Sequence, residues 1–159
     1  MVETKETVKL YFERLYPYIV SAIITIVAIK FKINFAFRKN LSNALDACNT
    51  VVALIIGFLG AILPVILGMK NESKIVKYVF ERDKNKLFLK YIKATIFWGL
   101  ITLVITISMY MIEDYQCSVV GTVEFYVWIF LVVFFLILTY RSLKSMLDLV
   151  FLSDDELPI

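Results

Sequence analysis

The chain has 159 residues, of which 60% are hydrophobic, and its mean hydropathy is +0.80. Ordinary soluble domains contain about 45–50% apolar residues, so this composition excludes a soluble globular protein and predicts an integral membrane protein. The net charge is +3 and histidine is absent, which removes the commonest general base and the commonest metal ligand.

The sequence shows no pattern that is typical of an enzyme. It contains no G-x-x-x-x-G-K-[ST], G-x-S-x-G or H-E-x-x-H motif. Its two cysteines, Cys48 and Cys117, are too few for a structural zinc site within one chain. We therefore expect a protein that is not an enzyme and that holds no metal or cofactor.

The first predicted membrane span covers residues 15–33. It follows a leader of mixed charge and is uncharged until Lys30. The acidic residues of the leader, and the bulky basic sequence after the span, argue against a cleaved signal peptide and favour a retained helix. Pro17 is expected near the helix start, where a missing N–H costs least. The amines of Lys30 and Lys32 would reach to the membrane interface.

The second predicted span, residues 44–69, carries the most information about function. Its 19 uncharged residues from Val51 to Met69 are long enough to cross about 30 Å of hydrocarbon. Polar and small residues recur in it at steps of three and four, which places them on one side of a helix. We call this side the polar–small face and predict that it lines a pore; its residues are Asn43, Asp46, Thr50, Ala53, Gly57, Gly60 and Pro64.

Two interpretations of the polar–small face stay open. In the first, it packs against a matching small face on the third span, because small residues let membrane helices approach closely. That second face consists of Thr95, Gly99, Thr102 and Thr106. In the other interpretation, several copies assemble with the polar–small face around a lumen. In that case the carboxylate of Asp46 would attract cations at the pore mouth. The alternative for Asp46 is a carboxylate that is solvated near the start of the helix.

Pro64 is expected to bend the second span. Its nitrogen carries no hydrogen and so cannot donate to the carbonyl of Gly60, a common cause of a kink. The bend would either only set the shape of the helix or act as a hinge that gates the pore. An alternative makes residues 41–69 a re-entrant hairpin, a structure that would have to be buried in protein.

A basic segment, residues 70–93, separates the second and third spans. It holds eight Lys or Arg residues, so the positive-inside rule places it in the cytoplasm together with both termini. We expect it to bind anionic lipid or a cytosolic partner and not nucleic acid, because it lies against the membrane. The predicted lipid- or partner-binding residues are Lys70, Lys74, Lys77, Arg82, Lys84 and Lys86.

The third and fourth predicted spans cover residues 94–112 and 123–140. The acidic loop between them has no Lys or Arg and should lie outside. The fourth span lacks small residues over 125–138, so we expect it to face mainly lipid, with Trp128 and Tyr140 near the interfaces. On this topology both cysteines lie outside, where they could form a disulfide or stay free. An acidic tail, residues 148–159, follows.

The order of these features resembles the RexB family of small four-span phage-exclusion proteins. The resemblance covers residues 15–140. It rests on the basic-aromatic exit Ile29–Lys32, the polar start Leu41–Leu45 of a glycine-rich second span, the exit Leu67–Gly68 into a basic segment with Lys74-Ile75 and Lys77-Tyr78, and the two spans that follow. It implies a membrane effector that admits ions through the bacterial inner membrane and stops a phage-infected cell by abortive infection.

We therefore predict an all-α, integral membrane four-helix bundle in the bacterial inner membrane. Four helices enclose little beyond their own packed side chains, so conduction would need a homo-oligomer. The expected partners are the lipid bilayer, further copies of the chain and a cytosolic or membrane trigger protein. The alternative is a non-conducting accessory or sensor subunit that docks a partner through residues 70–93.

Overall fold

The computed structural model describes residues 2–33, 38–69, 87–111 and 119–150. Four α-helices make up nearly all of these residues, and no strand occurs among them. The helices are α1 (Val2–Lys30), α2 (Arg38–Met69), α4 (Leu87–Met111) and α5 (Val119–Val150). The predicted all-helical class is therefore confirmed for this part of the chain. Each helix begins before the span predicted for it.

Three of the four helices are long and apolar enough to cross a membrane. Their apolar segments are Leu41–Val65, Leu89–Met111 and Val120–Leu147. The apolar part of α1 is shorter, Leu15–Lys30, and extends over about 24 Å at 1.5 Å per residue. This length is less than the roughly 30 Å of hydrocarbon in a typical bilayer.

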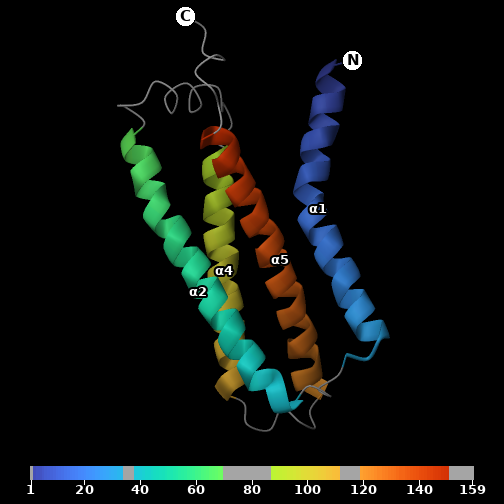
Figure 1. Ribbon diagram of the computed structural model, residues 1–159. Coiled ribbons are helices and arrows are strands. Elements are labelled where there is room, and N and C mark those ends of the chain that lie inside the picture. The colour runs from blue at the N-terminus through green and yellow to red at the C-terminus, as the bar shows by residue number, and fades with distance from the viewer. Residues whose placement is uncertain (1, 34–37, 70–86, 112–118, 151–159) are drawn as a thin grey trace, which may run out of the picture.

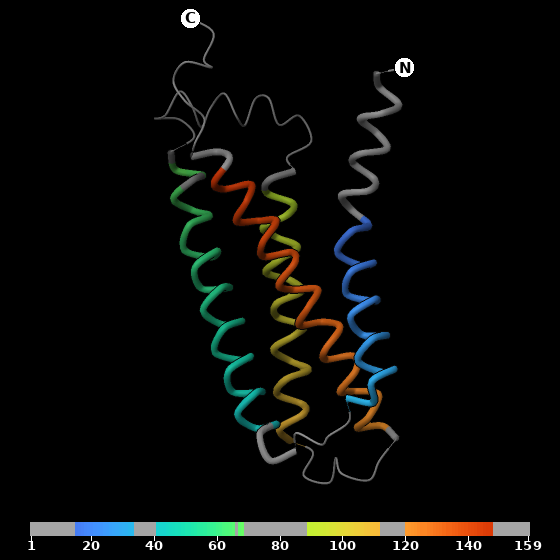
Figure 2. Tube along the Cα trace, turned by 45° about the vertical axis from the view of Figure 1, so that its right-hand side comes forward, coloured from blue at the N-terminus to red at the C-terminus, as the bar shows by residue number. Residues whose placement is uncertain are grey.

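The helices form a row in the order α1, α5, α4, α2, and neighbours in this row make the extensive contacts (Figure 1). Successive helices along the chain run in opposite directions (Figure 1). Helices α1 and α2 lie at opposite edges of the row in both views (Figures 1 and 2). We call the end at which α2 and α5 begin the Asp46 end. The first residues of α1 and the last residues of α5 lie at the other end (Figure 1).

Helix α5 is an inner helix of this row, which corrects the prediction that it mainly faces lipid. It contacts α4 on one side and α1 on another, and Phe134 and Phe135 are almost completely buried. Trp128 is also buried, whereas its predicted position near a membrane interface stays a prediction. The prediction failed because it took the absence of small residues as a sign of lipid exposure, whereas large aromatic rings fill the space between these helices.

Three helices meet closely at Gly99 of α4. A methyl group added at Gly99 would lie 2.6 Å from a ring carbon of Phe135 on α5 and 2.9 Å from Cδ1 of Ile56 on α2. A side chain at this position would therefore force Phe135 or Ile56 to shift. Because lipid gives no hydrophobic drive to helix association, close van der Waals packing of this kind is a main source of stability.

Hydrogen bonds that involve side-chain hydroxyl groups also join α4 to α5. The Thr95 hydroxyl lies 2.7 Å from the Ser142 hydroxyl and 3.2 Å from the Leu138 carbonyl oxygen. The indole N–H of Trp128 donates to the Thr106 hydroxyl oxygen over 3.0 Å. These side chains are buried, so the small face predicted on the third span is a packing surface, and its main partner is α5.

Helix α1 ends in a Schellman motif. The N–H of Ile33 donates to the Ala28 carbonyl and the N–H of Lys32 donates to the Ile29 carbonyl, each over 3.0 Å. Lys32 has φ of 45°, the left-handed conformation that this motif requires at its penultimate position. Pro17 lies inside α1 rather than near its start, and its carbonyl accepts a 2.7 Å hydrogen bond from the Ser21 hydroxyl.

Helix α2 is continuous over 32 residues. It passes through Gly57, Gly60 and Pro64 without an interruption, so the structure contains the unbroken helix and not the re-entrant hairpin. Its length exceeds the roughly 20 residues that a span needs.

A first prediction concerns the crossing at Gly99. We expect Gly99→Ala to lower the free energy of unfolding by about 1–3 kcal/mol, the usual cost of overpacking a filled core. Gly57→Ala is the matched control, because nothing lies within 4 Å of a methyl group at that position. The measurement is unfolding of the monomeric fraction in mixed micelles. Equal stability of the two variants would contradict this account of the crossing.

A second prediction concerns the hydroxyl groups of α4. Thr95→Val removes hydrogen bonds to α5 and should cost about 0.6–2 kcal/mol, the range for bonds between membrane helices. Thr102→Val is the control, since this equally buried hydroxyl donates to the Trp98 carbonyl of its own helix over 2.9 Å. The same unfolding assay compares the two, and a larger loss for Thr102→Val would refute the assignment.

Candidate functional site

The candidate site is the polar–small face of α2, which lies on the outer edge of the helix row. All seven residues predicted to line a pore are exposed in the single chain: Asn43, Asp46, Thr50, Ala53, Gly57, Gly60 and Pro64. A methyl group added at Gly57 or at Gly60 would meet no atom within 4 Å. The structure thus brings these residues together on one side of α2, and they remain exposed although Tyr110 of α4 reaches Asp46 at one end of this face.

The opposite side of α2 explains this orientation. Leu45, Val52 and Leu59 are 3%, 2% and 0% exposed, and they recur every seven residues. A seven-residue repeat of apolar side chains keeps one side of a helix against a partner over its whole length. α2 therefore packs against α4 through branched aliphatic residues.

This packing corrects one of the two interpretations of the polar–small face. The prediction that α2 and α4 meet through their two small faces is wrong. Thr95, Thr102 and Thr106 of α4 are buried, as that prediction required, but the glycines of α2 point elsewhere. Where α2 does approach the small face of α4, the contact is made by Ile56 against Gly99.

Two apolar clusters hold α2 in this orientation. One lies toward the Asp46 end and includes Leu45, Met109 and Trp128 as its buried members. The other lies toward the opposite end and includes Leu59, Ile92 and Met146. Because both clusters draw on α2, α4 and α5, a rotation of α2 that buried its polar–small face would break each of them.

Asp46 is tied to α4 by a single side chain. The hydroxyl of Tyr110, near the end of α4, donates to Oδ1 of Asp46 and lies 3.3 Å from the carbonyl oxygen of Ser42. The hydroxyl of Thr50 donates to the backbone carbonyl of Asp46 over 2.9 Å. The carboxylate is thus held at the Asp46 end of the polar–small face while it remains exposed.

A second carboxylate lies at the same end of the row but within a helix contact. The hydroxyl of Ser108 donates to Oε1 of Glu124 over 2.6 Å and links α4 to α5. Cys48 is a free, partly buried thiol within hydrogen-bonding reach of the Thr106 hydroxyl. These groups are arranged for hydrogen bonding between helices. No group of three His, Cys, Asp or Glu side chains that could hold a metal ion occurs in the described ranges.

Sequence reasoning missed the partners of the polar residues. Tyr110, Ser108 and Glu124 were not predicted as parts of any site. Their spacing along the chain carries no signal for these pairs, because each pair joins two helices whose relative position depends on packing. An alignment of helix ends by topology would have placed Asp46 and Tyr110 at the same membrane surface, but not in contact.

Two groups of predicted residues fall outside the described part of the chain. Lys70, Lys74, Lys77, Arg82, Lys84 and Lys86, expected to bind lipid or a partner, lie within residues 70–86. Cys117 likewise lies outside, while Cys48 is a free thiol, the alternative to the predicted disulfide. In the described part of the predicted basic segment, the ring centre of Tyr91 on α4 lies 3.7 Å from the guanidinium carbon of Arg141 on α5.

Comparison of the chain with models of protein families, with characterised proteins and with solved structures found no match.

A third prediction follows from the contact between Tyr110 and Asp46. If this hydrogen bond fixes the carboxylate, Tyr110→Phe should lower the melting temperature of the wild type but should have no further effect in Asp46→Ala. Such a double-mutant cycle isolates the pairwise interaction. Tyr140→Phe, at an exposed position of α5, serves as the control for loss of a hydroxyl. Additive effects of the two substitutions would contradict the contact.

Proposed function

We propose that this protein is a homo-oligomeric membrane pore that is lined by the polar–small face of α2. In this proposal all four helices cross the bacterial inner membrane, both termini are cytoplasmic, and the open pore lets ions pass and depolarises the cell. The observation that carries the proposal is the exposure of all seven predicted pore residues on one side of a long apolar helix.

An exposed backbone carbonyl supports a water-filled or protein-covered setting for this face. Pro64 has no N–H, so the carbonyl of Gly60 lacks its regular hydrogen-bond donor four residues later. Gly60 has no side chain to shield that oxygen. In hydrocarbon an unsatisfied backbone group costs several kcal/mol, so water in a lumen or a donor from a second copy is favoured over lipid.

The carboxylate of Asp46 supports the same setting. Ionisable groups in membrane helices are costly in lipid and usually face protein or water. Asp46 lies near the beginning of the Leu41–Val65 segment, with its carboxylate exposed and held by Tyr110. A ring of such carboxylates around an axis would concentrate cations at the pore mouth.

A single chain cannot enclose a lumen along the polar–small face of α2. The inner side of α2 is filled by its contact with α4, and α2 lies at the edge of the row. A lumen along the polar–small face therefore requires further copies, which a cyclic assembly supplies with identical contacts. One margin of the face would pack against the next α2 while the other faces water.

The biological setting in this proposal comes from the resemblance to the RexB family. It assigns the pore to abortive infection, in which a trigger that accompanies phage infection opens it. The alternative function, a non-conducting subunit that docks a partner through residues 70–93, is separated from the pore by the experiment that follows.

A fourth prediction tests the pore directly. Membrane potential is read with a voltage-sensitive dye in bacteria that express wild type, Gly57→Leu or Asp46→Asn at equal levels. We expect wild type to depolarise the cells, Gly57→Leu to abolish depolarisation by filling the lumen, and Asp46→Asn to reduce cation entry.

Ala47→Leu is the control for added bulk, since Ala47 lies in register with the exposed hydrophobic residues Leu54, Phe58 and Val65 of α2. Bacteria that express Ala47→Leu should be depolarised as strongly as those that express wild type. If none of the proteins changes the potential, the assay is repeated during phage infection. Intact potential there as well would reject the pore and favour the accessory subunit.

A further inference from the structure

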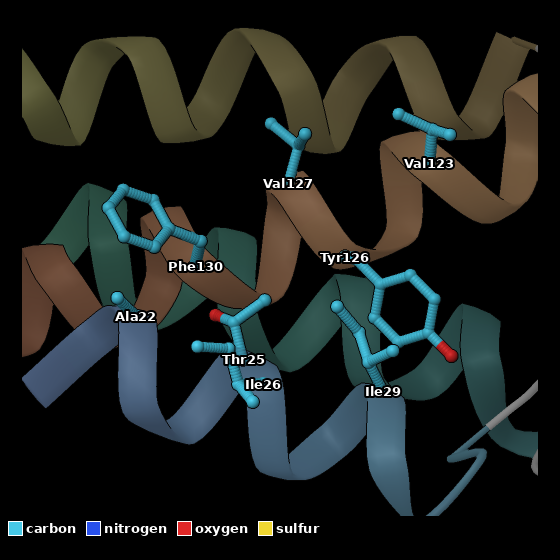
Figure 3. A pocket seen from close by; sticks show the side chains of 8 residues that line it. All are labelled: Ala22, Thr25, Ile26, Ile29, Val123, Tyr126, Val127 and Phe130. Atoms are coloured by element: carbon cyan, nitrogen blue, oxygen red, sulfur yellow. The ribbon is translucent and has the colours of Figure 1, made fainter.

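An open apolar groove of about 460 Å³ lies between α1 and α5, at the edge of the row opposite to α2. Figure 3 shows its lining from Ala22 and Phe130 at the inner end to Ile29 and Tyr126 near the end of α1. Its volume is within the range of sites that hold small molecules, about 300–1,000 Å³.

The inner part of the groove presents carbon atoms to a ligand. Its only hydroxyl-bearing residue apart from Tyr126 is Thr25, and that hydroxyl donates to the Ser21 carbonyl over 2.8 Å. The hydroxyl group of Thr25 is therefore satisfied by its own helix. Tyr126 lies beside Ile29 at the end of the groove (Figure 3).

The same end of the groove carries positive charge. Lys30 and Lys32 directly follow the lining residue Ile29, and both are exposed. The Schellman motif holds the backbone of Lys32 in place through the N–H groups of Lys32 and Ile33. No acidic residue occurs from Leu15 to Ile33, and Glu124 of α5 is engaged with Ser108 on the side of α4.

We propose that this groove binds one anionic phospholipid of the surrounding bilayer. One acyl chain lies between α1 and α5, and the phosphate is held by the amines of Lys30 and Lys32. The charge at the polar end matches an anionic head group, and the apolar inner end matches hydrocarbon. The inference requires only that α1 and α5 lie in the membrane; it does not depend on conduction through α2.

The groove suits an acyl chain better than a helix from a second copy. Along α1 it extends only from Ala22 to Ile29, about 10 Å at 1.5 Å per residue. It contains no glycine, and its rim is formed by large exposed residues such as Ile26. Such a short contact lacks the long small-residue surface that associating membrane helices use.

A bound lipid would act as part of the α1–α5 contact. Helix α1 makes its extensive contacts with α5 alone, through buried Pro17, Ser21 and Ala28 and through Tyr18, whose ring centre lies 4.6 Å from that of Phe134. The groove opens beside this contact. The docking of α1 on the rest of the protein would then depend on the lipid composition of the membrane.

The test is native mass spectrometry of the purified full chain with equal amounts of phosphatidylglycerol and phosphatidylcholine. Wild type should retain one phosphatidylglycerol in preference to phosphatidylcholine. The double substitution Lys30→Gln and Lys32→Gln should reduce this preference roughly fivefold per lysine, the effect of about 1 kcal/mol for each basic residue at the membrane surface. Ala22→Phe should reduce retention of both lipids by filling the groove.

Ile23→Phe is the matched control for Ala22→Phe, because Ile23 is exposed on α1 and does not line the groove. It should bind lipid like wild type. The lysine variant changes only exposed residues, so it keeps the test valid if Ala22→Phe fails to fold. Unchanged lipid preference in the lysine variant would overturn the proposal. Formation of a disulfide-linked dimer by Ile26→Cys, with Cys48 and Cys117 changed to serine, would also overturn it and assign the groove to a second copy.

Discussion

The close crossing of α2, α4 and α5 at Gly99 is the contact on which the arrangement of these helices depends. The missing side chain lets the ring of Phe135 and the end of Ile56 reach the backbone of α4 from two sides. In a membrane, helices gain stability from such close packing and from hydrogen bonds rather than from hydrophobic burial. The bond between Thr95 and Ser142 and the bond between Trp128 and Thr106 then fix the rotation of α5 on α4.

The position of α2 follows from the same crossing and determines what the protein exposes. With Ile56 at Gly99, the repeat of Leu45, Val52 and Leu59 must face α4. The polar–small face then lies on the outer side, although its small residues would permit close packing. A helix that turns its glycines away from its own chain is suited to contact other copies, which is the physical basis of the proposed pore.

The sequence was sufficient to predict the helices and the composition of each face, but not which faces meet. The sequence predicted four spans; three of these helices are long and apolar enough to cross a membrane, and the apolar part of α1 is shorter. The steps of three and four correctly placed Asn43 through Pro64 on one side of α2. The choice of partner failed for two reasons. Small residues on two helices do not specify that they pair, and the aromatic residues of α5 looked lipid-facing although Phe134 and Phe135 fill the centre. The partners of Asp46 and Glu124 depend on the relative depth of helices, which sequence spacing does not encode.

The central claim is that the polar–small face of α2 meets other copies in the membrane. It is tested most directly by a cysteine scan over residues 51–61 of α2, with the native Cys48 and Cys117 changed to serine, followed by oxidation in intact membranes. A disulfide needs Cβ atoms about 3.5–4.5 Å apart, so we expect dimers to peak at Ala53, Gly57 and Gly60. Leu136→Cys, an exposed position on α5, provides the background level. Dimer yields that do not vary along α2, or that stay at this background throughout, would contradict the account.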